Sequence, residues 1–184
     1  IGGMISAATE QSPILMGLLL GGVIKMICTS PLSSMALTAM LGLTGLPMGI
    51  AAIACFGGSF TNGVIFKMLH FGDNSNVAAV MMEPLTQAHI ITKHPIPIYC
   101  SNFFGGGFSG VAAAFLGIIN NAPGTASPIP GLLAPFAFNP PLKVLMALLL
   151  AAISGTLAGI VGAIVFKKKY DMKPELSVIN SFDE

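Results

Sequence analysis

The sequence predicts an all-α integral membrane protein with about four transmembrane helices and two broken, re-entrant helical hairpins. Composition is the first reason: of 184 residues, 54% are hydrophobic and only 8% are charged, whereas a soluble domain carries about 25% charged residues. The second reason is the spacing of the charges, because residues 26–66, 94–142 and 144–166 contain no Lys, Arg, Asp or Glu. Such runs fit lipid or the interior of a membrane bundle, where water-facing charge is not needed.

Four apolar segments approach the length of about 20 residues that a membrane-spanning helix needs. Pro13 suits the first turn of the first segment, and we expect Lys25 near its end to extend toward the membrane interface. The last segment is followed directly by Lys167, Lys168 and Lys169, which we expect to stop it. The predicted spans are residues 13–29, 46–66, 98–119 and 142–166.

Two other segments are apolar yet interrupted by proline, and we expect each to form a broken hairpin. In residues 71–97, a polar turn at Asp73–Asn76 with helix-capping chemistry precedes an apolar run in which Pro84 and Pro95 break the helix. Residues 122–141 hold six prolines and no charge, so they cannot form one continuous helix. Broken apolar segments at membrane depth often line the substrate site of a transporter.

Domain organisation and orientation follow from the same features. We expect residues 1–169 to form one membrane-embedded domain of transport type, part of a longer protein, and residues 170–184 to form a short tail. The cluster Lys167–Lys169 places that tail in the cytoplasm by the positive-inside rule. The glycines at 105, 106, 107, 110, 155, 159 and 162 have helical spacing, which favours close helix packing over a ligand role.

Several function classes are excluded by what the sequence lacks. A net charge of +1 without a basic patch gives no case for nucleic acid. Cys28, Cys55 and Cys100 are far apart in apolar runs, so we interpret them as buried hydrophobes and expect no metal and no cofactor. No Ser/His/Asp arrangement, paired acidic site or nucleotide-binding loop is present, so any covalent chemistry would need a partner protein.

Glu83 is the leading candidate for a functional residue. A carboxylate inside an apolar hairpin is costly, so it must pair, take up a proton or meet a polar substrate. An ionised carboxylate accepts hydrogen bonds strongly and suits the hydroxyl groups of a sugar. The alternative is a residue at the interface that caps a helix or pairs with Lys93.

The other candidate substrate-binding residues are polar side chains of the two hairpins. Gln87 shares a helix face with Glu83 if the helix continues past Pro84. His89 is a hydrogen-bonding or proton partner of Glu83, or else a structural side chain; His94 precedes Pro95 and so lies at a bend. In the second hairpin, Asn121, Thr125 and Ser127 approach Glu83 if the two hairpins meet tip to tip.

The motifs in these hairpins resemble those of a known family. Glu83-Pro84-Leu85 followed by His94-Pro95 is similar to the signature Glu-Pro-hydrophobic … Asn-Pro in the IIC membrane components of the bacterial sugar phosphotransferase system, with His94 in place of the usual Asn. The run Asn121–Thr125 resembles the second hairpin of the same proteins. The wider pattern over residues 12–166 is closest to the IIC-like subfamily that includes perfringolysin O regulator-type proteins.

The resemblance implies an elevator-type transport domain in a homodimer of the bacterial inner membrane, with two opposed hairpins that clasp a sugar or polyol. It also implies IIA and IIB partner proteins and a contact between Glu83 and the sugar. Because IIC chains are roughly twice this length, it implies that residues 1–169 belong to the C-terminal half of a longer IIC-like protein. Three functions stay open at this point: a permease coupled to phosphorylation by IIB, a transporter of the same fold without that coupling, and a membrane sensor or regulator that binds a solute without moving it.

Overall fold

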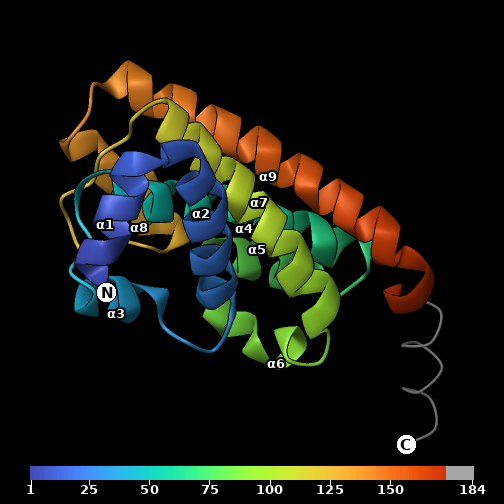
Figure 1. Cartoon of the computed structure of the whole chain (residues 1–184). Helices are drawn as coiled ribbons and strands as arrows, with labels where there is room; N and C mark the ends of the chain where they lie inside the picture. The colour runs from blue at the N-terminus through green and yellow to red at the C-terminus, as the bar shows by residue number, and fades with distance from the viewer. Residues whose placement is uncertain (173–184) are drawn as a thin grey trace, which may run out of the picture.

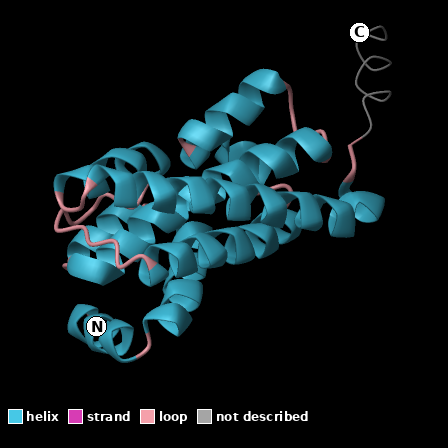
Figure 2. Cartoon of the chain, turned by 90° about the horizontal axis from the view of Figure 1, so that it is seen from above, coloured by secondary structure: helices cyan, strands magenta, loops and turns pink. Residues whose placement is uncertain are grey.

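The computed structural model describes residues 1–172, and this part of the chain consists of helices joined by short loops, with no strand (Figures 1 and 2). The helices are α1 (Gly2–Gln11), α2 (Pro13–Thr29), α3 (Ser34–Met40), α4 (Gly45–Met68), α5 (Asn74–Met82), η1 (Pro84–Gln87), α6 (Ala88–Ile91), α7 (Pro95–Phe115), α8 (Pro128–Leu133), η2 (Ala134–Ala137) and α9 (Pro141–Tyr170). The all-α prediction is therefore confirmed for these residues.

Four long helices, α2, α4, α7 and α9, form the body of the molecule, and glycines allow them to approach closely. Gly21 of α2 lies against Gly106 of α7, and Gly155 of α9 lies against Gly57 of α4. The glycines at 105, 106, 107 and 110 of α7 and at 155, 159 and 162 of α9 all lie at such contacts. A Cβ atom at any of them would overlap a neighbouring helix or a side chain that fills the interface. The prediction that these glycines serve helix packing is confirmed.

The bounds of the long helices agree with the predicted spans except in two places. α2 coincides with residues 13–29, and α4 exceeds 46–66 by one residue at its start and two at its end. α7 differs from the predicted 98–119, because it starts on Pro95 and ends at Phe115. Gly117 adopts a positive φ of 59° there, and the amides of Gly117 and Ile118 bond back to Ala114 and Ala113. This is the Schellman geometry that ends a helix, and the sequence prediction overlooked its glycine.

The second difference concerns α9, which does not stop at Lys167. It continues for one more turn to Tyr170, since lysine is a good helix former and favourable at a helix C-terminus. Just beyond, Asp171 pairs with His70 at a distance of 2.8 Å and so ties this end of α9 to the turn after α4. The rest of the predicted tail, residues 173–184, lies outside the described residues.

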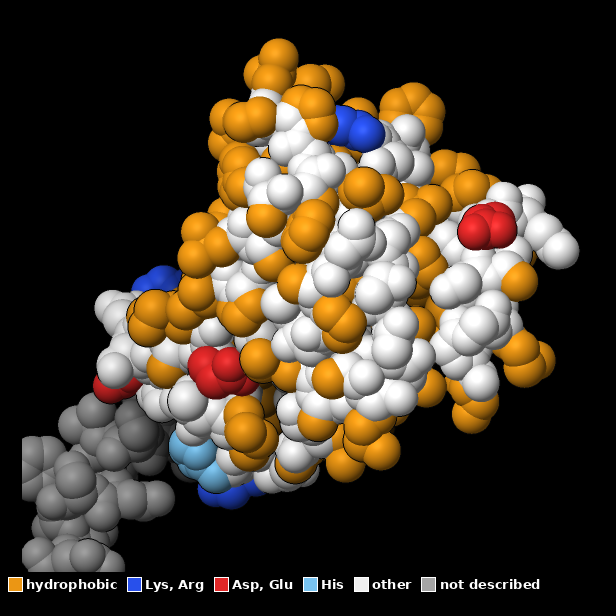
Figure 3. Space-filling view, turned by 90° about the vertical axis from the view of Figure 1, so that its left-hand side faces the viewer, with side chains coloured by type: hydrophobic (Ala, Val, Ile, Leu, Met, Phe, Trp, Pro, Cys, Tyr) orange, Lys and Arg blue, Asp and Glu red, His pale blue; other side chains and the backbone are white. Residues whose placement is uncertain are grey.

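Two of the described helices, α4 and α9, are both long enough and apolar enough to cross a membrane. They differ in surroundings: most of α4 is buried by other helices, whereas α9 exposes a row of large apolar residues that includes Leu149, Leu157 and Ile164. Figure 3 shows apolar side chains spread over one face of the molecule, with few charged ones among them. The predicted spans 13–29 and 98–119 remain predictions as membrane crossings.

The two proline-rich segments are broken, as predicted. In the first, α5 starts with the expected cap, in which Asp73 and Asn76 bond reciprocally to each other's backbone amides at 2.9 Å. α5 ends before Glu83, and η1 and α6 follow in a new direction. Val80 and Ile91 fix this segment against the second half of α4. In the second, α8 packs on the first half of α4, where Gly131 lies against Ala52.

Candidate functional site

A small cavity lies where the two broken segments meet. Its volume is about 130 Å³. Glu83 contributes a carboxylate from the first segment and Ser127 a hydroxyl from the second, while Cys28, Ser33 and Ser34 come from the end of α2 and the loop before α3. A carboxylate, three hydroxyls and a thiol thus line one small space, formed by parts of the chain that are far apart in sequence. The apolar side chains of Leu32, Met35 and Leu85 form the rest of its lining.

Proline explains how the sequence places the two central side chains. Glu83 and Ser127 each directly precede a proline, and each begins a short proline-initiated helix, η1 or α8. A residue before proline is held in an extended conformation, and the φ values of −147° and −148° agree with this. Both side chains therefore leave the chain at a helix break, where they point into the cavity rather than along a helix face.

The Glu83 carboxylate is joined to the second segment by a single hydrogen bond. The Ser127 hydroxyl donates to Glu83 Oε2 at 3.2 Å, and Ser127 is almost completely buried while Glu83 is exposed. Within residues 1–172 no other side-chain donor lies within bonding distance of this carboxylate, and Glu83 forms no ion pair with Lys93. The second carboxylate oxygen is consequently available to a solute.

Two serines of the loop before α3 complete the cavity and were not among the predicted site residues. The Ser34 hydroxyl donates to the carbonyl oxygen of Ala126 at 2.6 Å, which fixes the start of α3 to the second broken segment. Ser33 accepts a hydrogen bond from the amide of Ala36 and caps α3. The loop before α3 is thereby held in place as the third wall of the cavity.

Gln87 does not reach the cavity. The helix does not continue past Pro84, so Gln87 and Glu83 do not share a helix face. Instead, the buried Gln87 accepts a hydrogen bond from Asn76 at 2.8 Å and connects η1 to the start of α5.

The two histidines also lie away from the cavity. His89 is exposed on α6. His94 stacks on Phe71, with 4.3 Å between ring centroids, at the bend before α7. Partial burial, and then the neighbouring Lys93 charge, lowers the pKa of His94 below its ordinary value.

In the second segment, Asn121 and Thr125 hold the loop rather than line the cavity. Asn121 accepts a hydrogen bond from the amide of Gly45 at 3.0 Å. The Thr125 hydroxyl accepts from Asn120 and donates to the carbonyl of Ala122, both at 2.8 Å. Of the seven predicted site residues, the structure brings together only Glu83 and Ser127.

A comparison with protein families decides what kind of protein contains this site. The model of the family described as "Phosphotransferase system, EIIC" matches residues 1–177, which is nearly the whole chain. The chain belongs to the phosphotransferase system EIIC family. Neither the curated proteins nor the solved structures gave a match.

Family membership establishes the broad role of this EIIC chain. It is a membrane permease component of a bacterial sugar phosphotransferase system, located in the inner membrane, and the family acts on sugars together with IIB proteins. The apolar surface of α9 agrees with a bilayer environment. Within residues 1–172, no three His, Cys, Asp or Glu side chains gather closely enough to hold a metal ion.

Lys25 is a further ionisable residue of this EIIC chain near the site, and the prediction that it extends to the membrane interface is wrong. Its side chain is fully buried among α2, α4 and α7, in the space left by Gly58 and Gly106. The ammonium reaches only the carbonyl oxygen of Cys55, at 3.5 Å. Cys28, one turn further along α2, lines the cavity.

A buried ammonium with one long hydrogen bond is a costly arrangement for stability. No described carboxylate lies within ion-pair distance of Lys25. Charged residues inside membrane domains usually serve a site or a pathway. Cys28, which lines the cavity, lies three positions after Lys25 on α2, so the cavity between the two segments is a candidate for such a role.

Proposed function

We propose that this EIIC chain binds the transported sugar in the cavity between the two broken segments, with Glu83 as its principal hydrogen-bond acceptor. The observation that supports this most is the hydrogen bond from Ser127 to Glu83 at 3.2 Å. It occupies one carboxylate oxygen and leaves the other free to bind a solute. A free carboxylate oxygen accepts hydroxyl hydrogens strongly. Ser33 keeps its hydroxyl hydrogen for donation to a sugar, whereas Ser34 and Ser127 already donate within the protein and offer lone pairs that accept.

The size of the cavity supports a small solute. Its volume of about 130 Å³ is well below the roughly 300–1,000 Å³ of sites for drug-sized ligands. A single sugar unit or a polyol suits this space better than an oligosaccharide does. Lys25, one turn before the cavity residue Cys28 on α2, is the buried cation that we expect to offset the negative charge of Glu83.

We further propose that a separate IIB protein phosphorylates the bound sugar at the cytoplasmic face. In this proposal the phosphoryl group arrives on IIB, which is a partner that the family implies. Glu83 can accept the proton of the reacting hydroxyl while the hydroxyl oxygen takes the phosphoryl group from IIB. A cytoplasmic C-terminus, an elevator-type motion and a homodimer belong to the same proposal, and the family resemblance supports them.

Transport into reconstituted vesicles tests this function. Radiolabelled sugars and polyols are supplied outside, with IIB enclosed in its phosphorylated or unphosphorylated form. We expect accumulation of the sugar phosphate only with phosphorylated IIB. Entry of unmodified sugar without IIB would instead show a transporter without phosphorylation, and saturable binding without any entry would show a sensor or regulator.

A further inference from the structure

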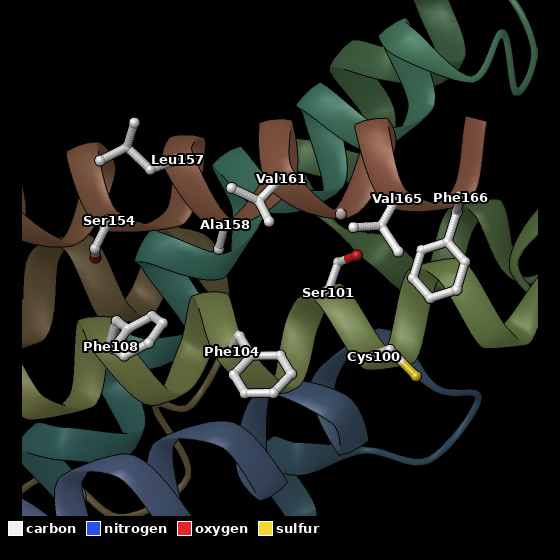
Figure 4. Close-up of a pocket in the computed structure, with 11 residues that line it drawn as sticks. Cys100, Ser101, Phe104, Phe108, Ser154, Leu157, Ala158, Val161, Val165 and Phe166 are labelled. Atoms are coloured by element: carbon white, nitrogen blue, oxygen red, sulfur yellow. The ribbon is translucent and has the colours of Figure 1, made fainter. Parts of the chain in front are cut away.

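A long apolar groove runs between α7 and α9, separate from the cavity that contains Glu83. Its volume is about 680 Å³. Figure 4 shows Phe104 and Phe108 of α7 on one side and Leu157, Val161 and Val165 of α9 on the other. All five of these side chains are at least half exposed, so the groove opens on the outer surface of the helical body. Small residues at its base, Ala158 among them, leave the space unfilled.

The length of the groove matches one leaflet of a bilayer. On α9 it extends from Ser154 to Phe166, which is twelve helical steps, or about 18 Å at about 1.5 Å per residue. Half of a hydrocarbon core that is about 30 Å thick measures about 15 Å. A single acyl chain that lies along the groove therefore reaches from the membrane interface to the middle of the bilayer.

The end of the groove at Phe166 carries positive charge. Lys167, Lys168 and Lys169 follow it directly on α9, and all three side chains are exposed. Tyr170 lies beside them, with the Lys169 ammonium 5.5 Å from its ring, as is common at the level of the lipid headgroups. Clusters of lysine at the end of a spanning helix attract anionic lipids.

Ser101 is a second polar feature of the groove. It is 3% exposed, and its hydroxyl has no hydrogen-bond partner in the protein. Ser101 lies opposite Gly162, five helical steps or about 8 Å below Lys167. The hydroxyl oxygen itself is buried against Gly162, so Ser101 forms part of the base of the groove and does not reach a bound lipid.

We propose that the groove between α7 and α9 binds one anionic phospholipid, with an acyl chain along Phe104, Phe108 and Val161 and the headgroup at Lys167–Lys169. The lysines account for the preference for a negatively charged headgroup, and the groove determines where on the protein the lipid binds. This site is independent of the sugar cavity, since the two share no residue.

Fluorescence quenching tests the site, because the chain contains no tryptophan of its own. Phe104→Trp places a single tryptophan in the groove, and the matched control Ile164→Trp places one on the exposed surface of α9 outside it. Each full-length variant is reconstituted in phosphatidylcholine vesicles with a minor fraction of brominated phosphatidylglycerol or, separately, brominated phosphatidylcholine. The quenching ratio of the two brominated lipids is the measured quantity.

We expect this ratio to be about fivefold higher for Phe104→Trp than for Ile164→Trp, which is the preference that one lysine near an anionic headgroup confers. Replacement of Lys167, Lys168 and Lys169 by Gln should make the quenching ratio of Phe104→Trp equal to that of Ile164→Trp. Ala158→Phe, which fills the groove, should have the same effect. Equal ratios in the starting variants would overturn the proposal. A groove tryptophan that neither lipid quenches would also overturn it, and would show that protein, such as a second copy of the chain, covers the groove.

Discussion

The two hollows of this EIIC chain differ in almost every respect. The groove between α7 and α9 is about 680 Å³ in volume and almost wholly apolar, whereas the cavity between the broken segments is about 130 Å³ and contains a carboxylate and three hydroxyls. The groove is formed by two regular helices, and the cavity by helix breaks at prolines. Size alone would select the groove as the sugar site. The polar groups that line the smaller cavity indicate instead that the cavity is the sugar site, since sugars are recognised by hydrogen bonds.

The strongest test of this contrast is Glu83→Gln. We expect sugar affinity to fall about a hundredfold, because a hydrogen bond to a charged group contributes up to about 3 kcal/mol. Isothermal titration with the best sugar from the transport assay measures it, with the melting temperature as a check of folding. Glu10→Gln, the same chemical change on the exposed surface of α1, should leave affinity unaltered. Wild-type affinity in Glu83→Gln would remove the carboxylate from the site.

The next test separates the stability of the cavity wall from its function. Lys25→Met keeps the length of the side chain and removes a buried charge, so we expect the free energy of unfolding to rise by about 2 kcal/mol. We expect sugar affinity to fall in the same variant, because the charge that balances Glu83 is lost. Thermal unfolding and titration report the two quantities independently. A variant that is more stable and binds normally would show that Lys25 has no part in the site.

A smaller effect is expected for Ser127→Ala. Loss of one hydroxyl that bonds to Glu83 should weaken sugar binding about fivefold, which corresponds to about 1 kcal/mol. Thr125→Ala is the matched control, because Thr125 bonds only within its own loop. Equal losses in the two variants would mean that support of the loop, rather than a contact in the cavity, explains the effect.

The smallest effect on sugar binding is expected from a substitution in the groove. Ala158→Phe fills the apolar space between α7 and α9 and should leave sugar affinity unchanged, since none of its neighbours lines the cavity. Titration under the conditions used for Glu83→Gln provides the comparison. A large loss of affinity here would show that the two hollows are coupled, and the contrast between them would no longer hold.

Much of the fold could be predicted from the sequence because its signals are local. Charge-free runs and prolines fix the long helices and the breaks between them, and Pro84 and Pro128 decide where Glu83 and Ser127 lie. Three other predicted residues lie outside the cavity and already have partners: Gln87 bonds to Asn76, Asn121 to the amide of Gly45, and Thr125 within its own loop. A sequence does not show which polar groups are paired in this way.

What the sequence could not show depends on contacts between distant segments. Ser34 joins the site through a hydrogen bond to Ala126, 92 positions along the chain. The burial of Lys25 depends on Gly58 and Gly106 in two other helices. From the neighbouring sequence alone, the serines before α3 can be interpreted only as helix caps, and Lys25 only as the polar end of a membrane-spanning helix.

The position of Lys25 has a mechanical consequence for any transport motion. Its aliphatic stem fills the space at Gly58 and Gly106, so α2 cannot shift by one turn along α4 without overlap of that stem with a side chain. We therefore expect α2, α4 and α7 to travel as one rigid body. A covalent cross-link between α2 and α7 that preserves sugar uptake would agree with this, and one that arrests uptake would show that the helices slide.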